Sequence, residues 1–499
     1  MNKKLFTSTF LAAALAISSP ISMLQASTEG SFDDTGGVLA TTNAIKDIEY
    51  QIMVQRATQL AIWAMPAVGM NDFITATRRD LGGDLNDVIY LSKPFDSKHG
   101  FLTANDVTAY SWASLTSEPG PIIIEVPAAS DKVNYFGTVV NAWDQPIEDV
   151  GPAGADKGKG GKYLFLPPGY KGDKSKEELQ KEGYLVYQTD TYQYGFSFRP
   201  VLSNGGTDAD AAEYAQKIKI YYLADAANPP PTKYFDAAEK PYDCLPYYNF
   251  TFFEDINDSI QNNPIRPQDK VMVSLAKGLG IEKGKPFKPT ERQKKAIEEG
   301  LSLAYASMQD YFIAPGKAMI PLWKKDNTLL SQWLVWNFAP GQPQSGFPYE
   351  TEDSVLVDDR AGGSYFWITY LPKYLGSGTF YLTGLRDKKG DLLDATSTYK
   401  LNVPKDTPAK DFWSVIVYSM ETKGFVRNAK RVGLSSRNKE TMQVNSDGSY
   451  DVYLGPKAPK GKESNWIPTG EDFFLLFRLY GPESKTFYKT WVLGDIEKI

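Results

Sequence analysis

The chain has 499 residues, of which 42% are hydrophobic, 23% charged and 13% aromatic, and its formal net charge is −6. This is the composition of a folded globular protein of two or three domains, and its acidic balance argues against nucleic acid as a partner. The single His and single Cys exclude a zinc site with several His ligands and an intramolecular disulfide. A Ser-His-Asp triad would need His99 as its base, and Cys244 is expected to be a small buried hydrophobic residue.

Residues 1–26 have the pattern of a secretory signal peptide. Lys3 and Lys4 precede a short apolar run that Pro20 ends, and Ala26 stands at a cleavage site before Ser27. We therefore expect a periplasmic or secreted protein. No later apolar run is long enough to cross a bilayer, so we expect no transmembrane segment in the mature chain.

Residues 42–206 are predicted to form an N-terminal helix followed by a β domain. Apolar residues at helical spacing predict a helix from Thr42 or Asn43 that Pro66 kinks or ends, with a second segment running to Arg79. From residue 88 the apolar period becomes two, and turn residues recur, which predicts an antiparallel sandwich or barrel. The expected strands are Val88–Leu91, Thr108–Leu115, Pro121–Val126, Tyr135–Trp143, Lys162–Leu166, Tyr184–Gln188 and Tyr194–Phe198.

Residues 207–325 are predicted to be mostly helical. Thr207 can cap a first helix, and a second helix is expected from Phe250 to Asn262. Pro267 is placed to open a third helix that ends near Gly278 to Gly280. A capping box at Thr290 to Gln293 predicts a fourth helix that reaches Phe312.

Residues 326–499 are predicted to form a C-terminal β-sandwich domain. Asn445 to Ser449 is expected to be a hairpin with an Asp-Gly turn. The expected strands are Leu330–Phe338, Ser364–Tyr370, Thr379–Leu385, Trp413–Tyr418, Thr441–Asn445, Tyr450–Leu454, Phe473–Leu479 and Phe487–Val492.

The chain has no phosphate-binding loop, dinucleotide fingerprint or nucleophile elbow. The chemistry that remains belongs to carboxylates, arginines and aromatic rings. Aromatic rings beside Pro, Gly or acids can stack on sugars or planar ligands, although packing between sheets is the commoner role. The rings in this position are Tyr110, Trp112, Trp143, Tyr365, Trp367, Trp466 and Tyr480. Arg199, Arg360 and Arg478 lie in or beside apolar strands, where each could bind an anionic ligand or satisfy a buried carboxylate.

Several segments together resemble a bacterial domain of unknown function, numbered twelve-fifty-four (DUF1254). They are Leu102 to Trp112, Glu118 to Pro127, Tyr135, and Asn141 to Asp144. The family pattern includes an Asn-Asp-Thr-Leu-Tyr-Ser-like run; here Val107 is inserted before the Thr, and Ala109 stands where Leu is usual.

A second set of segments resembles the companion domain numbered twelve-fourteen (DUF1214) more closely. They are Phe412 to Val415 with Tyr418, Asn445 to Ser449, Tyr453 to Pro456, Asn465 to Pro468, Arg478 to Glu483, and Trp491. The paired resemblance implies an exported protein with a β-rich N-terminal domain and a C-terminal sandwich of jelly-roll type. It implies no established activity.

These observations predict an α+β, β-dominated fold: an antiparallel β domain, a helical middle and a jelly-roll-like β-sandwich. The leading hypothesis is a soluble envelope protein that binds a small or carbohydrate-like ligand between the two β domains. We expect no metal and no cofactor, and oligomeric state stays open. The ligand-binding candidates are Asp106, Tyr110, Trp112, Asp144, Arg199, Trp466, Arg478 and Tyr480.

Two alternatives stay open. One is a hydrolase that uses Asp106 with Asp144, or Glu254 with Asp255, as general acid and base. The other is a structural or interaction protein of the cell envelope, whose aromatic strands pair with partners.

Overall fold

The computed structural model describes residues 31–32, 38–39, 47–314, 316–326, 328–336, 349–364, 373, 379–484 and 486–499. The chain divides into two compact units, Met1–Ile52 and Met53–Ile499. In the first unit, the short strands β1 (Ser31–Phe32) and β2 (Val38–Leu39) pair antiparallel. The predicted signal peptide and the predicted helix start at Thr42 or Asn43 lie outside the described residues.

The first long helix, α1 (Ile48–Ala76), does not end at Pro66 as one reading of the sequence expected. It runs through the proline, continues as a π-helical turn, η1 (Thr77–Leu81), and stops at Gly82, whose φ is 70°. Nearly every side chain in the middle of α1 is buried, which is typical of a helix enclosed by other elements. Tertiary packing on all sides therefore holds the helix where the missing N–H of Pro66 alone would weaken it.

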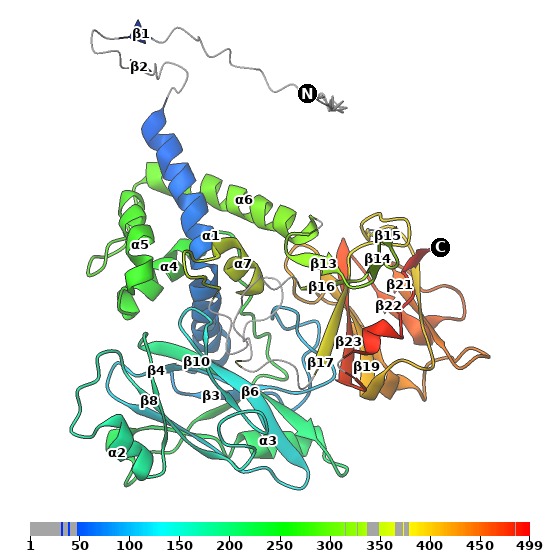
Figure 1. Ribbon diagram of the computed structural model, residues 1–499, viewed down its shortest axis with the longest axis horizontal. Helices are drawn as coiled ribbons and strands as arrows, with labels where there is room; N and C mark the ends of the chain where they lie inside the picture. Colours follow the sequence, from blue (N-terminus) through cyan, green and yellow to red (C-terminus); the bar gives the residue numbers. More distant parts are fainter. Residues whose placement is uncertain are drawn as a thin grey trace, which may run out of the picture. The chain divides into compact units, whose positions relative to one another are not determined.

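The N-terminal β region is a sandwich of a six-stranded sheet, ordered β12-β3-β4-β10-β6-β7, and a four-stranded sheet, ordered β11-β5-β8-β9 (Figure 1). Most pairs are antiparallel, but β12 with β3 and β8 with β9 are parallel. All seven predicted strands are present, whereas β7, β11 and β12 were not predicted. The strands are β3 (Val88–Tyr90), β4 (Ser111–Thr116), β5 (Ile122–Val126), β6 (Val133–Asn141), β7 (Pro146–Val150), β8 (Gly161–Leu166), β9 (Leu185–Gln188), β10 (Gln193–Leu202), β11 (Lys219–Tyr222) and β12 (Tyr234–Asp236).

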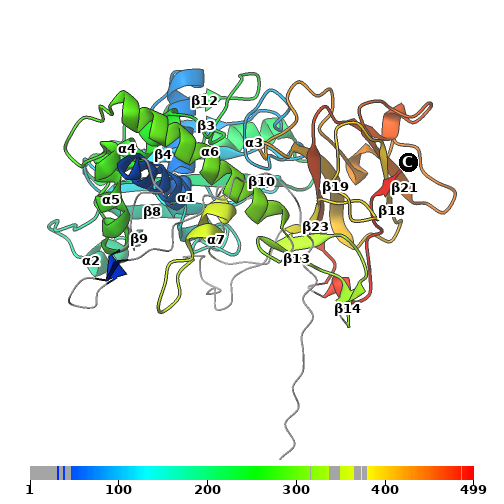
Figure 2. The same ribbon diagram turned by 90° about the horizontal axis from the view of Figure 1, so that it is seen from above.

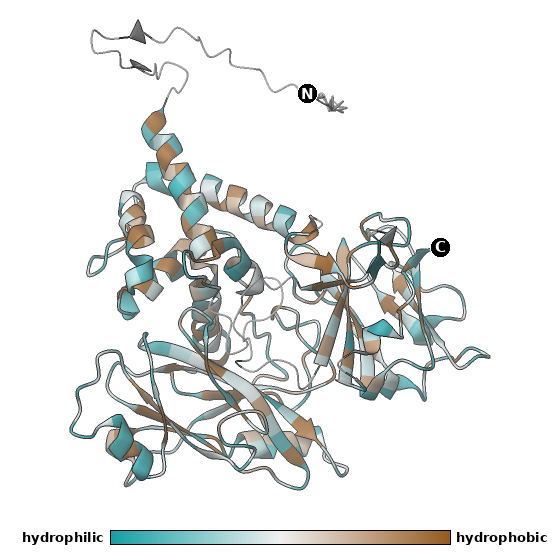
Figure 3. Cartoon of the chain, viewed as in Figure 1, coloured by the Kyte–Doolittle hydropathy of each residue, from teal (hydrophilic) through white to brown (hydrophobic). Residues whose placement is uncertain are grey.

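The helical middle forms largely as expected. Thr207 caps α3 (Asp208–Ala215), and Thr290 forms a capping box with Gln293 at the start of α6. The segment between α3 and α4 is not helical, however, because it supplies β11 and β12 to the N-terminal sheets. The other helices are α2 (Lys176–Lys181), which was not predicted and is mostly hydrophilic in Figure 3, α4 (Thr251–Asn262), α5 (Lys270–Ala276), α6 (Glu291–Ile313) and α7 (Val357–Gly362).

The C-terminal β region is a second sandwich, of a six-stranded sheet ordered β13-β16-β17-β23-β19-β20 and a four-stranded sheet ordered β22-β21-β18-β24. Figure 2 shows β19 and β23 on one side of this sandwich and β18 and β21 on the other. The strands are β13 (Met319–Pro321), β14 (Lys324–Lys325), β15 (Thr328–Leu329), β16 (Leu334–Trp336), β17 (Thr379–Gly384), β18 (Tyr399–Val403), β19 (Ala409–Ser419), β20 (Gly433–Ser435), β21 (Tyr450–Gly455), β22 (Trp466–Pro468), β23 (Phe473–Pro482) and β24 (Glu497–Lys498).

Two strand predictions in this region are wrong. The segment Thr441–Asn445 is not a strand, because its backbone bonds to a side chain: Gln443 donates to Asn465 and accepts from it at 2.7 and 2.8 Å. The Asp-Gly turn therefore precedes β21 without closing a hairpin. The segment Phe487–Val492 starts as a 3-10 turn, η8 (Phe487–Lys489), in which the Trp491 amide donates to the Phe487 carbonyl. Most of the predicted strand Ser364–Tyr370 lies outside the described residues.

The two six-stranded sheets each bury both faces. In β10, Tyr194, Phe196 and Phe198 enter the N-terminal sandwich core, so Gly195, Ser197 and Arg199 lie on the opposite face. In β23, Phe477 and Leu479 enter the C-terminal core, which leaves Arg478 and Tyr480 on its other face. A third core, built from α1, α4 and α6, also takes up Trp112 of β4, Ile416 of β19 and Leu476 of β23. The outer faces of both sandwiches thus converge on the helices.

The contact between α1 and α6 depends on Gly300, because a Cβ there would lie 2.4 Å from the Cβ of Ala57. Although Ala is the better helix former, Gly300→Ala should lower the free energy of unfolding by about 1–3 kcal/mol through overpacking. Gly69→Ala in α1 is the matched control, since nothing lies within 4 Å of its Cβ position. That substitution should stabilise by about 0.5–1 kcal/mol. Urea unfolding measures both, and a Gly300→Ala variant as stable as the wild type would contradict the close contact.

Candidate functional site

The outer faces of the two sheets bring together a group of side chains that we call the arginine–tyrosine cluster. Arg199 comes from β10 and Tyr110 from the segment before β4, while Tyr381 comes from β17. Arg478 and Tyr480 come from β23, and Asp106 lies in the loop before β4. Strand alternation explains the C-terminal members, because Tyr381 pairs directly with Arg478 across β17 and β23 and directly opposed residues share a face.

Hydrogen bonds and ring contacts tie the cluster together across the two β regions. Nη2 of Arg199 donates to the Tyr110 hydroxyl, and its guanidinium carbon lies 5.0 Å from the Tyr110 ring centre. Nη2 of Arg478 donates to the Thr103 carbonyl at 2.8 Å. Asn105 Nδ2 donates to the Tyr480 hydroxyl, also at 2.8 Å. The loop before β4 is therefore held directly against β23.

The electrostatics of the cluster separate its titratable groups. Burial raises the pKa of Tyr381, but the positive charges of Arg199 and Arg478 outweigh burial and leave that pKa below its ordinary value. Burial raises the pKa of Asp106 to about 6, with a smaller opposing effect from Arg478. Burial likewise raises the pKa of Tyr480 to about 12. The cluster thus lowers the pKa of Tyr381 and raises the pKa values of Asp106 and Tyr480.

Several buried polar atoms of the cluster have no hydrogen-bond partner among the described residues. They are Oδ1 of Asp106, Nε of Arg199, Oγ of Ser414, and Nε and Nη1 of Arg478. Ser414 on β19 is fully buried and pairs with Arg478 across β23. In the described part of the chain, neither arginine has a carboxylate oxygen within ion-pair distance. Buried polar atoms usually find partners, so this concentration of unmet hydrogen-bonding capacity marks the cluster as a candidate binding site.

Two of the predicted ligand-binding residues lie away from this cluster. Trp112 is fully buried in the helical core, where its indole N–H donates to the Tyr242 hydroxyl at 3.1 Å. Trp466 lies on β22, in the other sheet of the C-terminal sandwich, and its indole N–H donates to the Gly455 carbonyl at 3.0 Å. Tyr365 and Trp367 lie outside the described residues.

Asp144 also lies apart from the cluster. It is buried at the turn between β6 and β7 with a φ of 56°. Asn141, three residues earlier, pairs with Tyr194, which is five residues, or about 17 Å, along β10 from Arg199. The ring centre of its neighbour Trp143 lies 4.6 Å from the guanidinium carbon of Arg266 and 5.3 Å from that of Arg360. The structure therefore does not place Asp144 beside Asp106 as an acid–base pair.

The other proposed acid–base pair, Glu254 and Asp255, is divided between solvent and core. Glu254 is exposed, whereas Asp255 is buried and accepts a 2.6 Å hydrogen bond from Asn71 on α1. Burial raises the pKa of Asp255 to about 7. Burial, together with the charge of Asp255, also raises the pKa of Asp72. The hydrogen-bond partner of Asp255 therefore lies on α1 and is not Glu254.

The single His and the single Cys are both built into the core. His99 is fully buried, and its ring nitrogens lie 3.1 Å from the Asp96 amide and 3.0 Å from the Ala237 carbonyl oxygen. Cys244 is buried, and burial raises the pKa of its thiol well above the ordinary value. Neither is placed to act on a ligand at the cluster.

Family models match two parts of the chain, and both are described as proteins of unknown function. The DUF1254 model matches residues 85–222, and the DUF1214 model matches residues 378–484. The chain pairs a DUF1254 domain with a DUF1214 domain. Each domain contributes one arginine to the cluster, Arg199 from the DUF1254 domain and Arg478 from the DUF1214 domain. A search of curated proteins gives no match.

Two solved structures are similar to this DUF1254–DUF1214 chain. The VPA0106 protein from Vibrio parahaemolyticus is 17% identical, with a TM-score of 0.51 over 90% of this chain and all of its own. An uncharacterized protein from Burkholderia cenocepacia is 10% identical, with a TM-score of 0.37 over 91% of this chain and 95% of its own. The first likeness concerns the fold.

Tyr381 and Ser414 were not among the predicted site residues. Tyr381 lay within a predicted strand, Thr379–Leu385, between Phe380 and Leu382. Its alternation with those two residues places it on the face that Arg478 shares. The pattern was therefore readable, but nothing in the sequence shows which neighbouring strand β17 would pair with.

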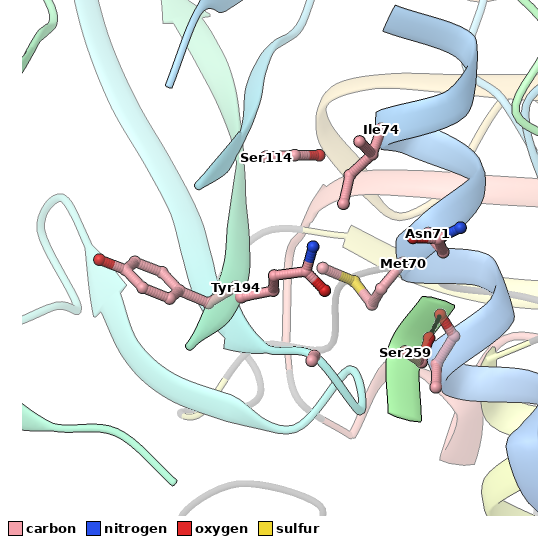
Figure 4. Close-up of a pocket in the computed structure, with 9 residues that line it drawn as sticks. Met70, Asn71, Ile74, Ser114, Tyr194 and Ser259 are labelled. Atoms are coloured by element: carbon pink, nitrogen blue, oxygen red, sulfur yellow. Dashed lines mark hydrogen bonds between the residues drawn. The ribbon is translucent and has the colours of Figure 1, made fainter. Parts of the chain in front are cut away.

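Two hollows in the described residues lie away from the cluster. One, of about 10 Å³, lies between α1 and β10 and is lined by Met70, Asn71, Ser114 and Ser259 among others (Figure 4). The Tyr194 ring beside it extends away from α1 in this view. The other, of about 180 Å³, lies against β11 and Pro230–Pro231. The first has room for about one water molecule.

The buried Asp255 predicts a pH-dependent stability. An unfolded Asp ionises near pH ~4, whereas folded Asp255 does so near pH 7, so folding takes up a proton between these values. Its contribution to the free energy of unfolding therefore falls as pH rises from about 4 to about 7. Asp255→Asn should remove this loss and gain on the order of 1–3 kcal/mol above pH ~7.

Urea unfolding at several pH values measures the effect, with Glu254→Gln as the exposed neighbouring control. A gain for Asp255→Asn that is the same at acidic and alkaline pH would contradict it.

Proposed function

We propose that this protein binds a small ligand carrying an anionic group at the arginine–tyrosine cluster. The observation that supports this is the pair of arginines, Arg199 and Arg478, which have unpartnered N–H groups and no carboxylate partner among the described residues. A carboxylate, sulfate or phosphate group would accept hydrogen bonds from these donors and balance their charge. Asp106, Tyr110, Arg199 and Tyr381 each keep some exposed surface, although Asp106 Oδ1 and Arg199 Nε are themselves buried.

We propose that this ligand is acidic and carbohydrate-like. The Phe412 and Tyr480 rings pack on each other with their centres 4.0 Å apart, and the guanidinium carbon of Arg437 lies 3.8 Å from the centre of Phe412. Tyr110 adds a partly exposed ring whose hydroxyl already binds Arg199. Amphipathic rings beside charged hydrogen-bond donors suit a sugar that carries an acid group.

The carboxylate-dependent hydrolase is less well supported. Asp144 lies apart from Asp106, and Glu254 is exposed while Asp255 bonds to Asn71 on α1. The third alternative, an envelope interaction protein, predicts no small-molecule binding and is decided by the same experiment.

Export of the protein is part of this proposal. The basic residues, short apolar run and small residues at Ala26 support a cleaved signal. No helix in the described residues is long and apolar enough to cross a membrane. Mass spectrometry of the protein from a bacterial periplasmic or culture fraction should find Ser27 at the N-terminus; an intact Met1 would contradict cleavage.

Binding should depend on the charge of Arg199. Calorimetry against uronic acids, small dicarboxylates, sulfate and phosphate is expected to find at least one ligand. Arg199→Gln should weaken that ligand about 10–100-fold, because it loses a charged hydrogen bond. Arg431→Gln is the matched control, since Arg431 donates to the backbone carbonyls at 463, 464 and 466 and is not part of the cluster. Arg199→Lys tests whether charge alone suffices if the glutamine variant folds poorly.

Asp106→Asn should act in the opposite direction. Because Asp106 ionises near pH 6, its negative charge reduces the positive potential of Arg478, and wild-type affinity should fall as pH rises through about 6. The asparagine variant should bind more tightly above that pH and show a flatter profile. Equal binding by Arg199→Gln and the wild type, or no anion bound at all, would sink the proposed function.

A further inference from the structure

A long β-hairpin in the C-terminal β region leaves its sheet before it turns. Its base is formed by β13 and β16, which pair antiparallel within the six-stranded sheet. Beyond the base, β14 and β15 form a separate two-stranded ribbon. Figure 2 shows β14 at the margin of the C-terminal β region, beyond β13. Residues 324–326 and 328–330 are called the hairpin tip below.

The base of the hairpin is anchored by two buried tryptophans. The indole N–H of Trp323 donates to the Tyr488 carbonyl at 2.9 Å, and its ring centre lies 6.1 Å from that of Trp491. The indole N–H of Trp333 donates to the Gly494 carbonyl, also at 2.9 Å. These contacts hold the strands on both sides of the tip, so the tip extends from a fixed support.

The tip carries exposed leucines beside exposed lysines. Leu329 and Leu330 are 41% and 54% exposed, and Lys324 and Lys325 are exposed as well. Lys324 pairs directly with Leu329, so an ammonium group and an apolar side chain share one face. A two-stranded ribbon by itself is marginally stable in water, and neither leucine belongs to a core of the protein. Their exposure therefore points to a partner outside the fold.

The segment that supports the ribbon continues this surface. Val492 is 46% exposed, and Lys489 is exposed. Asp326 is the only acid in the sequence from 324 to 330, and Asp495 is engaged at the base, where it accepts hydrogen bonds from residues 331 and 332. Lysines thus outnumber free acids at the tip, although the chain as a whole has a net charge of −6.

From this placement we infer that the hairpin tip docks the protein on an anionic lipid surface. Leucines on a projecting ribbon can enter the apolar boundary of a bilayer while the fold stays unchanged. Lysines beside them then lie at headgroup level, where negatively charged lipids attract them. A tip of six described residues is small for a stable protein interface, which usually takes about 20–30 residues a side. Docking is independent of ligand binding at the arginine–tyrosine cluster.

Sedimentation with lipid vesicles tests the inference on the full-length protein as it is recovered from a periplasmic or culture fraction. Vesicles of phosphatidylethanolamine and phosphatidylglycerol should retain the protein, whereas vesicles of phosphatidylcholine alone should retain much less. Raising the salt concentration from about 0.05 to about 0.5 M should weaken retention, because salt screens the lysine charges. All variants share one N-terminus, so an apolar leader cannot produce a difference between them.

Leu330→Gln should lower the partition coefficient for the anionic vesicles by about 5–10-fold, because an apolar side chain no longer enters the bilayer. Leu303→Gln is the matched control and should bind like the wild type. Leu303 is also 54% exposed, but it lies on α6, four residues after Glu299. Thermal unfolding should be the same for both variants, since both positions are on the surface.

A second pair of variants tests the charges. Lys324→Gln combined with Lys325→Gln should lower the partition coefficient by about 10–30-fold at low salt. Lys457→Gln combined with Lys460→Gln is the control, because it removes the same charge from exposed positions elsewhere in the DUF1214 domain. An equal loss in the two double variants would show that retention follows net charge alone and would overturn the docking tip.

Other outcomes also decide the inference. No retention by the anionic vesicles, or equal retention of Leu330→Gln and the wild type, would overturn it. Self-association in analytical ultracentrifugation that Leu330→Gln abolishes would assign the tip to a second copy of the chain and overturn the lipid surface. Because anion binding at the cluster is measured without lipid, each of these failures leaves the proposed function intact.

Discussion

The central constraint on this structure is that two arginine charges are held between two sheets without a carboxylate partner among the described residues. Arg199 and Arg478 belong to different β regions, so neither sandwich alone could satisfy them. Burying a charge is costly unless hydrogen bonds and opposite charge compensate. Backbone and phenol oxygens meet part of this need through the Thr103 carbonyl and the Tyr110 hydroxyl. The remaining compensation of the two arginine charges must come from Tyr381 and from a ligand bound at the cluster.

The arginines can occupy this place because both six-stranded sheets bury both faces. An antiparallel sheet in a sandwich usually leaves one face to solvent, and a charged residue there would simply be hydrated. Here α1, α4 and α6 cover much of the second face through a shared core. Small residues on β10, Gly195 and Ser197, precede Arg199 on that face, so the sheets and helices approach closely before the polar cluster begins.

The sequence predicted local structure well wherever a local signal determined it. Capping boxes at Thr207 and Thr290 and the alternation of β10 and β23 depend on neighbouring residues, and each was readable. The failures have non-local causes. In the predicted strand Thr441–Asn445, the backbone of Gln443 forms hydrogen bonds with the Asn465 side chain instead of with another strand. The strand β7 was missed because it carries two buried acids, one of which, Asp149, accepts a hydrogen bond from Thr138. Both depend on partners that only the folded chain brings near.

The same distinction explains why part of the site was predictable. Arg199 and Arg478 were chosen because they lie in or beside apolar strands, and Asp106, Tyr110 and Tyr480 because they lie at the entry to a strand or beside Gly or acids. These are local signals, and the structure brings all five residues together. Trp112 carried the same kind of signal and is a core residue. Alternation alone cannot distinguish them, because both classes lie on the face opposite the sandwich core. Their neighbours on that face separate them: Trp112 packs against the Phe95 and Phe101 rings, whereas the Arg478 guanidinium lies over the Tyr381 and Tyr418 rings. The chemistry of the site is therefore set by the pairing of β17 with β23 and by the loop before β4, which are properties of the tertiary fold.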